Sequence, residues 1–162
     1  MARVRADVAR AANDLEVLLG RLRRRLRAEA PNKGIPLSQM AVLNRVVRDG
    51  PDTASGLASA EKVRAQSMAL TIANLEGQGL VERESDPTDR RRILVGATAK
   101  GRQVVQSVRR SRQAWLARAI TTCFSEEEQE TLVKAMALFE RLADCDIDTV
   151  ADSSRRGPRM EE

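Results

Sequence analysis

The sequence contains no histidine and no tyrosine, and its aromatic residues are Phe124, Phe139 and Trp115. Without histidine there can be no Ser-His-Asp or Cys-His nucleophile pair and no His-ligated zinc. We therefore expect no enzyme activity, no cofactor and no bound metal. A core with so few aromatic side chains must be built from Leu, Val, Ile and Ala, which favours packed helices over a β-sandwich.

Cysteine and long apolar runs are also scarce. Cys123 and Cys145 are the only cysteines, and they form no CxxC motif. No apolar run reaches the roughly 18 residues that a membrane helix needs. These features predict a reduced, cytoplasmic protein with no membrane contact. A redox trigger is the alternative role for the thiols, but no lysine lies immediately beside either one, so we interpret both as structural.

Lysine is rare among the cations, because 24 of the 28 basic residues are arginines. The net charge is +5, made of +5 in residues 1–63, +5 in residues 64–112 and −5 in residues 113–162. A guanidinium group suits phosphates and guanine edges, although a GC-rich coding bias also raises the arginine content. The distribution predicts a basic surface over the first two thirds of the chain.

Apolar residues spaced by three and four predict a long helix over residues 4–26, which ends before Pro31, Gly34 and Pro36. Arginines crowd the end of this helix. We interpret them as a solvated flank near a helix C-terminus, with a binding site as the alternative. They are Arg21, Arg23, Arg24, Arg25 and Arg27.

Three shorter helices are expected next, over 39–49 with Ser38 as N-cap, from Ser55, and over 65–78 with Gly79 closing the last. The expected inward residues of the last two are Leu57, Ala58, Val63, Met68, Ile72 and Leu75. The apolar period then changes, and residues 80–84 and 92–96 predict two strands joined by a charged turn.

Two further helices complete the pattern. Thr98 is the expected cap of the first, which runs to about Cys123, and Ser125 begins a capping box for the second, which runs to about Val150. Their expected inward residues are Val104, Val108, Trp115, Ala119, Ile120, Leu132, Met136, Phe139, Leu142 and Ala143. We interpret Trp115 as part of a core or dimer seam, with a ligand pocket as the alternative. Residues 151–162 are expected to be a disordered tail.

Two short helices followed directly by a hairpin with a basic tip form a winged helix-turn-helix. The expected fold class is therefore mainly α with a small β-hairpin. The second helix of such a pair can enter the DNA major groove, and the hairpin can place arginine in the minor groove. Along the 65–78 helix, the positions away from the expected core are Arg64, Gln66, Ser67, Leu70, Thr71 and Asn74. On the hairpin the candidate contacts are Arg83, Asp89, Arg90 and Arg91, with a merely solvated, self-paired hairpin as the alternative.

The same segment resembles the MarR family of bacterial transcriptional regulators, whose pattern reads LExxGLVxR, then P-x-D-R-R, then LTxxG. The matching residues are Leu75, Glu76, Gly79, Leu80, Val81, Arg83, Pro87, Asp89, Arg90, Arg91, Thr98 and Gly101. The resemblance spans about residues 4–148. It departs from the common pattern at Arg64, Ala69, Leu70 and Ala97, which predicts a different base preference.

The resemblance implies roles for individual residues. Arg91 matches the regular wing arginine, Asp89 the acidic residue that orients it, and Arg90 the tip position that reaches the minor groove. Gln66, Ser67 and Thr71 fall on the DNA side of the recognition helix. It also implies an N-terminal dimerisation helix and linker over 1–36, a DNA-binding domain over 37–98 and C-terminal dimerisation helices over 99–150.

The expected function is a sequence-specific DNA-binding regulator, and the resemblance favours a repressor. It implies a homodimer on a pseudo-palindromic operator, released by a small amphipathic or phenolic ligand. A sequence-neutral architectural DNA-binding protein is the main alternative. A helical interaction scaffold is another, and an enzyme is the least favoured.

Overall fold

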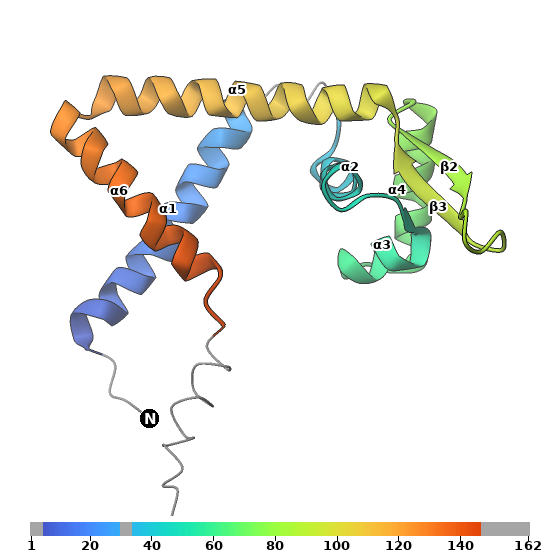
Figure 1. Cartoon of the computed structure of the whole chain (residues 1–162), viewed down its shortest axis with the longest axis horizontal. Coiled ribbons are helices and arrows are strands. Elements are labelled where there is room, and N and C mark those ends of the chain that lie inside the picture. The colour runs from blue at the N-terminus through green and yellow to red at the C-terminus, as the bar shows by residue number, and fades with distance from the viewer. Residues whose placement is uncertain (1–4, 30–33, 147–162) are drawn as a thin grey trace, which may run out of the picture. The chain divides into compact units, whose positions relative to one another are not determined.

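The structure is a computed structural model that describes residues 5–29 and 34–146. These residues form helices and a small sheet, which Figure 1 shows with their labels. In chain order the elements are α1 (Ala6–Glu29), α2 (Leu37–Asp49), β1 (Asp52–Thr53), α3 (Ala54–Ala60), α4 (Ala65–Gly77), β2 (Val81–Ser85), β3 (Ile93–Ala97), α5 (Ala99–Cys123) and α6 (Glu126–Ala143). The fold is mainly helical, as the sequence predicts.

The chain divides into two compact units, one that ends at Leu116 and one that begins at Ala117. α5 runs across this boundary. The first unit contains α1, the helix-turn-helix elements, the sheet and most of α5, and the second contains the end of α5 and α6. The functional division at residues 36 and 98 stays a prediction, and the predicted tail lies outside the described residues.

The core lies within the first unit, between residues 35 and 108. Its largest fully buried side chains are Leu43, Leu57, Met68, Ile72, Leu75 and Val95, contributed by α2, α3, α4 and β3. Burying one such aliphatic side chain contributes about 1.5–3 kcal/mol. The predicted inward positions of α3 and α4 are confirmed, except that Val63 is 46% exposed.

The sheet has three antiparallel strands in the order β1-β3-β2. The hairpin pairs Val81 with Ala97 and Ser85 with Ile93, so each predicted strand is displaced by one residue. The sequence analysis missed β1, which pairs Asp52 with Val95 and Thr53 with Leu94. A strand of two residues has no alternation from which to predict it.

The predicted caps are partly confirmed. Ser38 lies inside α2, whose N-cap is Pro36, so the prediction of a Ser38 cap is wrong. Proline presets a backbone angle compatible with a helix start, which needs no side-chain hydrogen bond. Thr98 does cap α5, because its Oγ1 accepts a hydrogen bond from the Gly101 N–H at 3.0 Å. Ser125 and Glu128 form the expected capping box at the start of α6.

α1 and α6 contribute no buried residue to the core. On α6 the expected inward residues Met136, Phe139 and Leu142 are between 43% and 58% exposed. On α1 Leu18 and Leu22 are similarly exposed. The prediction that the α6 residues point inward therefore does not hold within a single chain.

The described helices differ from membrane spans. None of them is both long enough and apolar enough to cross a lipid bilayer.

Gly101 sets how closely α5 begins against the winged region, because the Leu80 carbonyl oxygen occupies the place where a Cβ would lie. The same carbonyl accepts a hydrogen bond from the Thr98 N–H at 3.1 Å. We expect Gly101→Ala to lower the free energy of unfolding by about 1–3 kcal/mol through overpacking. Urea denaturation at fixed protein concentration measures this change.

Gly77 provides the matched control, since it also lies in a helix but a Cβ there meets nothing within 4 Å. Gly77→Ala should leave the stability unchanged or raise it by up to about 1 kcal/mol. Equal effects of the two substitutions would show that the Leu80 contact is unimportant.

Candidate nucleic-acid interface

The turn between α3 and α4 sets the direction in which α4 leaves the first helix of the pair. Lys62 adopts a left-handed conformation with φ of 54°. The Lys62 N–H donates to the Ser59 carbonyl at 3.1 Å, and the Val63 N–H donates to the Ala58 carbonyl at 3.0 Å. These bonds satisfy the last carbonyls of α3 and end that helix. α4 can then begin at Ala65 in a new direction.

Arg45 fastens this turn to α2. Its Nε lies 2.6 Å from Glu61 Oε1 in a partly buried ion pair, and its Nη2 donates to the Ala60 carbonyl at 3.4 Å. Arg45 also lies 3.4 Å from Asp49 on its own helix. A guanidinium that bonds to two elements holds their relative position more firmly than a single contact would. The α3–α4 turn is therefore supported from α2.

α4 has one buried side and one exposed side. Met68, Ile72 and Leu75 are at most 1% exposed and pack into the core. Thr71 is half-buried, and its Oγ1 donates to the Ser67 carbonyl at 2.9 Å. The remaining predicted contacts on this helix are exposed, with no side-chain hydrogen bond or ion pair among the described residues. They are Arg64, Gln66, Ser67 and Asn74.

The loop that joins β2 to β3 is the wing, and it projects beyond the sheet (Figure 1). Asp86 organises it, because its Oδ1 accepts hydrogen bonds from the Thr88 N–H at 2.8 Å, the Thr88 hydroxyl at 2.6 Å and the Asp89 N–H at 3.3 Å. Asp86 is 7% exposed. The hydrogen bond from the Thr88 side chain, supported by those from the backbone and by Arg92, lowers the pKa of the Asp86 carboxyl.

Asp89 holds the backbone at the tip of the wing. Its Oδ1 accepts a hydrogen bond from the Arg91 N–H at 3.0 Å, and its carbonyl accepts one from the Arg92 N–H at 2.9 Å. Asp89 thus positions Arg91 through the main chain. The guanidinium groups of Arg90 and Arg91 are exposed and have no partner among the described residues. They remain available for an external anion.

Arg83 differs from the other predicted cations because it is already paired. Its Nε donates to Glu76 at 3.0 and 3.1 Å, which connects β2 to α4. The two side chains are 46% and 33% exposed, so the pair contributes at most about 1 kcal/mol. The sequence analysis placed Arg83 among the DNA contacts and missed Glu76 as its partner. The pairing gives Arg83 a role in positioning the wing relative to α4.

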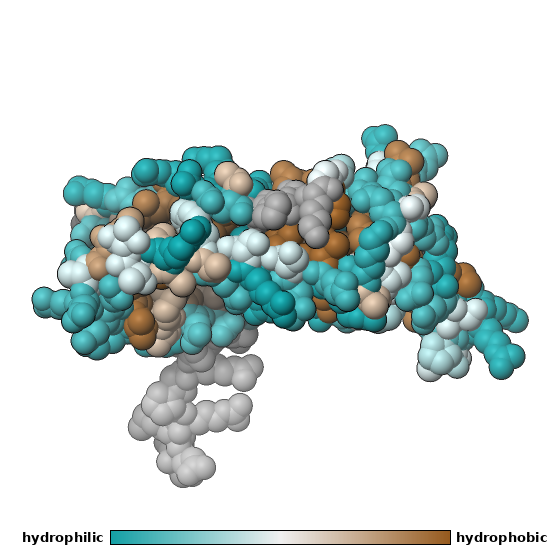
Figure 2. All heavy atoms as spheres, turned by 90° about the horizontal axis from the view of Figure 1, so that it is seen from above, coloured by the Kyte–Doolittle hydropathy of each residue, from teal (hydrophilic) through white to brown (hydrophobic). Residues whose placement is uncertain are grey.

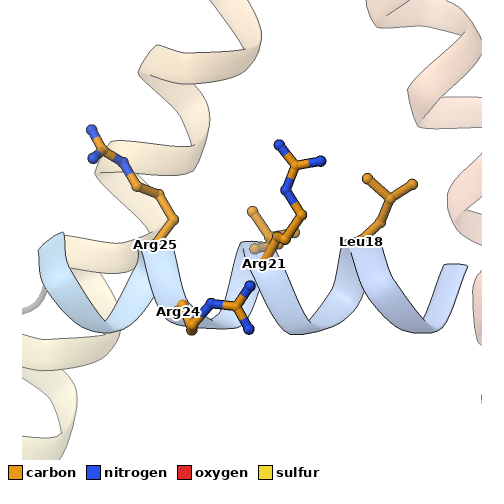
Figure 3. A pocket seen from close by; sticks show the side chains of 5 residues that line it. Leu18, Arg21, Arg24 and Arg25 are labelled. Carbon is orange, nitrogen blue, oxygen red and sulfur yellow. The ribbon is translucent and has the colours of Figure 1, made fainter. Parts of the chain in front are cut away.

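A second group of cations lies on α1. Arg21, Arg24 and Arg25 line an open hollow of about 530 Å³ together with Leu18 and Leu22. Figure 3 shows Leu18, Arg21 and Arg25 on one side of α1 and Arg24 on the other. The Arg25 guanidinium also lies 5.6 Å from the centre of the Trp115 ring, a cation–π contact. These arginines are more than a uniformly solvated flank.

Side chains that could bind a metal or react as thiols are not grouped together in the part of the chain that the structure describes. There, no three His, Cys, Asp or Glu side chains are close enough together to hold a metal ion. Cys123 and Cys145 are exposed free thiols. The polar side of α4 and the wing are consequently the main candidate surface.

Known proteins with similar sequences and structures share this winged helix-turn-helix arrangement. A family model described as MarR family covers residues 33–92. An HTH-type transcriptional regulator of Mycobacterium tuberculosis is 38% identical over 136 residues, which cover 84% of this chain and 94% of the relative. The crystal structure of a transcriptional regulator protein from Pseudomonas aeruginosa is 34% identical with a TM-score of 0.75, and covers 88% of this chain and 100% of that one. The chain belongs to the MarR family.

This MarR family member is a transcriptional regulator with a winged helix-turn-helix, and its relatives are regulators rather than enzymes. The same fold occurs in a MepR variant from Staphylococcus aureus, which was crystallised bound to an oligodeoxyribonucleotide. That protein is 20% identical with a TM-score of 0.61, and the match covers 83% of this chain and 98% of that one. In this chain, α4 is the second helix of the helix-turn-helix.

The role of Asp86 in the wing can be tested with two substitutions. Asp86→Ala removes the acceptor, whereas Asp86→Asn keeps an oxygen that can accept the bonds from Thr88 and Asp89. We expect backbone hydrogen exchange at Thr88 and Asp89 to accelerate in the alanine variant and to stay close to wild type in the asparagine variant. Unchanged exchange in both variants would contradict this role.

The wild-type wing should also respond to acid. The pKa of Asp86 is lower in the folded state than in the unfolded chain. The Asp86 carboxylate therefore contributes fully to stability above about pH 4, and this contribution is lost as the pH falls through the lowered pKa of the folded state. Hydrogen exchange at Thr88 in Asp86→Asn should lack this acid-dependent step, since the amide does not titrate.

Proposed function

We propose that this regulator is a homodimer that binds a pseudo-palindromic operator in a sequence-specific manner and represses transcription there. The observation that carries the proposal is the uncharged polar side of α4 beside two unpaired arginines at the wing tip. The polar side chains of α4 can discriminate between bases, and the wing-tip arginines can neutralise phosphates or enter the minor groove. Binding by α4 and the wing would cover a promoter and exclude other proteins from it.

The exposed side chains of α4 suit the major groove. Gln66 and Asn74 carry amides that can bond in a bidentate manner to adenine, and Arg64 can bond to guanine or a phosphate. Ser67 is suited to a phosphate or a base edge. The MepR variant bound to an oligodeoxyribonucleotide supports this use of the fold. We propose Thr71 as a contact of lesser importance, because its hydroxyl already bonds within the helix.

The wing suits the adjacent minor groove. A narrow minor groove concentrates negative potential and attracts arginine. Arg91 is held at its backbone by Asp89, so the tip is ordered locally while the guanidinium stays free. We assign Arg90 and Arg91 to DNA contact, and Asp89 and Arg83 to positioning of the wing.

The exposed apolar residues of α1 and α6 support a homodimer. Figure 2 shows hydrophobic atoms between the hydrophilic ones on the face that it presents. On α1 and on α6, exposed apolar residues recur at helical spacing along one side of the helix, and a soluble monomer would bury such a stripe. A second copy of the chain can cover these residues: Leu18, Leu22, Met136, Phe139 and Leu142. A symmetric dimer then presents two α4 helices to half-sites about one helical turn apart.

The hollow beside α1 supports an effector of amphipathic, anionic character. Its lining combines Leu18 and Leu22, which belong to the proposed dimer seam, with three guanidinium groups, so a bound ligand would contact that seam. Such a ligand would bind one form of the dimer better than another and shift the population away from the DNA-binding form. The change in operator affinity cannot exceed the ratio of the ligand's affinities for the two forms.

Competition between duplexes separates this proposal from a sequence-neutral architectural role. DNA fragments selected by the purified protein should bind typically about 10³–10⁷ times more tightly than unrelated duplex. Equal affinities would favour the architectural role, and no binding at low salt would favour an interaction scaffold.

Arg91→Ala should weaken binding to the selected duplex by about 1–3 kcal/mol, because the variant loses a free guanidinium in the minor groove. Titration at fixed salt measures this loss. Lys134→Ala is the matched control, since it also removes one positive charge but lies on α6 and pairs with Glu130. If the two variants bind equally well, the assignment of Arg91 is wrong.

Phe139→Glu should shift the dimer toward monomers, because it places a charge within the proposed apolar seam. Sedimentation equilibrium measures the change in dissociation constant. Ala137→Glu adds the same charge on the side of α6 that carries Lys134 and Arg141, and should leave the assembly unchanged. A Phe139→Glu protein that dimerises as well as the control would contradict the interface.

A further inference from the structure

Leu70 is an apolar side chain in the middle of the exposed side of α4. It is 66% exposed, more than any other large hydrophobic side chain between residues 34 and 116. Each residue turns a helix by about 100°, so Leu70 lies nearly opposite the buried Met68 and Ile72. It therefore points away from the core, on the side of α4 that we propose contacts DNA.

The neighbours of Leu70 on the helix surface are small or uncharged. Gln66 precedes it by one turn, and Ala73 follows it by nearly one turn. Among the cations, Arg64 is the N-cap of α4, more than one turn before Leu70, and Arg90 and Arg91 lie on the wing. The side of α4 farthest from the core thus presents the amide of Gln66 and, one turn later, the aliphatic side chain of Leu70. These uncharged groups are suited to base edges rather than to phosphates.

Leu70 also borders a hollow of about 330 Å³ beside α4, whose lining includes Val63 and the polar residues Ser38, Glu61, Ser67 and Thr71. Val63 is itself 46% exposed. Two aliphatic side chains therefore adjoin one small concavity at the start of the recognition helix. The aliphatic part of this lining, Leu70 and Val63, can contact a methyl group.

Only one base presents a methyl group in the major groove, which is thymine with its 5-methyl. Gln66, one turn away, has the amide that suits adenine. We infer that Leu70 determines specificity by contacting a thymine 5-methyl group in each half-site, next to an adenine bonded by Gln66. The inference rests on the proposed binding of DNA through α4, and it adds which base pairs the helix selects.

Replacing thymine by deoxyuridine tests this contact, because it removes the methyl group and keeps the base pair. The full-length protein is first used to select a site from randomised duplexes. Each thymine of that site is then replaced singly by deoxyuridine, and affinities are measured at fixed salt for the wild type, Leu70→Ala and Leu70→Met. Since Leu70 is exposed, the variants should fold, which thermal melting followed by circular dichroism verifies.

For the wild type we expect one thymine in each half-site whose replacement weakens binding about four-fold, the value of one buried methyl group. Leu70→Ala should lose this sensitivity, and Leu70→Met, which keeps an aliphatic side chain, should retain it. A deoxyuridine outside the footprint should change nothing with any protein.

The inference is overturned if a selected site exists but no thymine is sensitive, or if Leu70→Ala remains as sensitive as the wild type. Either result leaves sequence-specific binding by α4 intact. If no duplex is preferred over unrelated DNA, the proposed function itself fails, and the Leu70 contact fails with it.

Discussion

Met68, Ile72 and Leu75 are almost fully buried, and their burial fixes the rotation of α4 about its own axis. A helix with one side held in a packed core can present only the opposite side to a ligand. The exposed positions of Gln66 and Leu70 follow from this constraint. The bonds of Arg45 to the α3–α4 turn then fix the direction of the helix, so that both its rotation and its course are determined by the fold.

The wing depends on a different kind of support. Its order comes from hydrogen bonds within a few residues of each other, centred on the carboxylates of Asp86 and Asp89. Such bonds hold the backbone and leave the arginine side chains free to move. The Arg83–Glu76 pair adds a weak link to α4. α4 is thus held by side chains packed in the core, whereas the tip of the wing is held by local hydrogen bonds to its backbone.

Most of the fold follows from patterns that the sequence displays locally. The helices carry apolar residues at spacings of three and four, and Thr98 and Ser125 mark two helix starts. Features that depend on contacts between distant residues were missed. β1 is too short for any period and is defined by its pairing with β3, and the partner of Arg83 lies on another element. The start of α2 is a local feature that was also assigned wrongly, since Pro36 rather than Ser38 is the N-cap. Candidate contacts could be named from the polar positions of α4. The pairing of Arg83 with Glu76 could not, because it depends on how β2 lies against α4.

The separation of charged and neutral groups has a consequence for DNA recognition. The proposed DNA contacts of Arg64 and the wing arginines act through charge. Their contribution to affinity falls as the salt concentration rises, because the counterions that they release from the duplex then enter a more concentrated solution. Gln66 and Leu70 carry no charge, and contacts of this type keep their value at high salt. Total affinity should therefore fall with salt while the preference among base sequences changes little. The two properties belong to different side chains, the charged ones at the wing tip and at the N-cap of α4, and the neutral ones along the exposed side of α4.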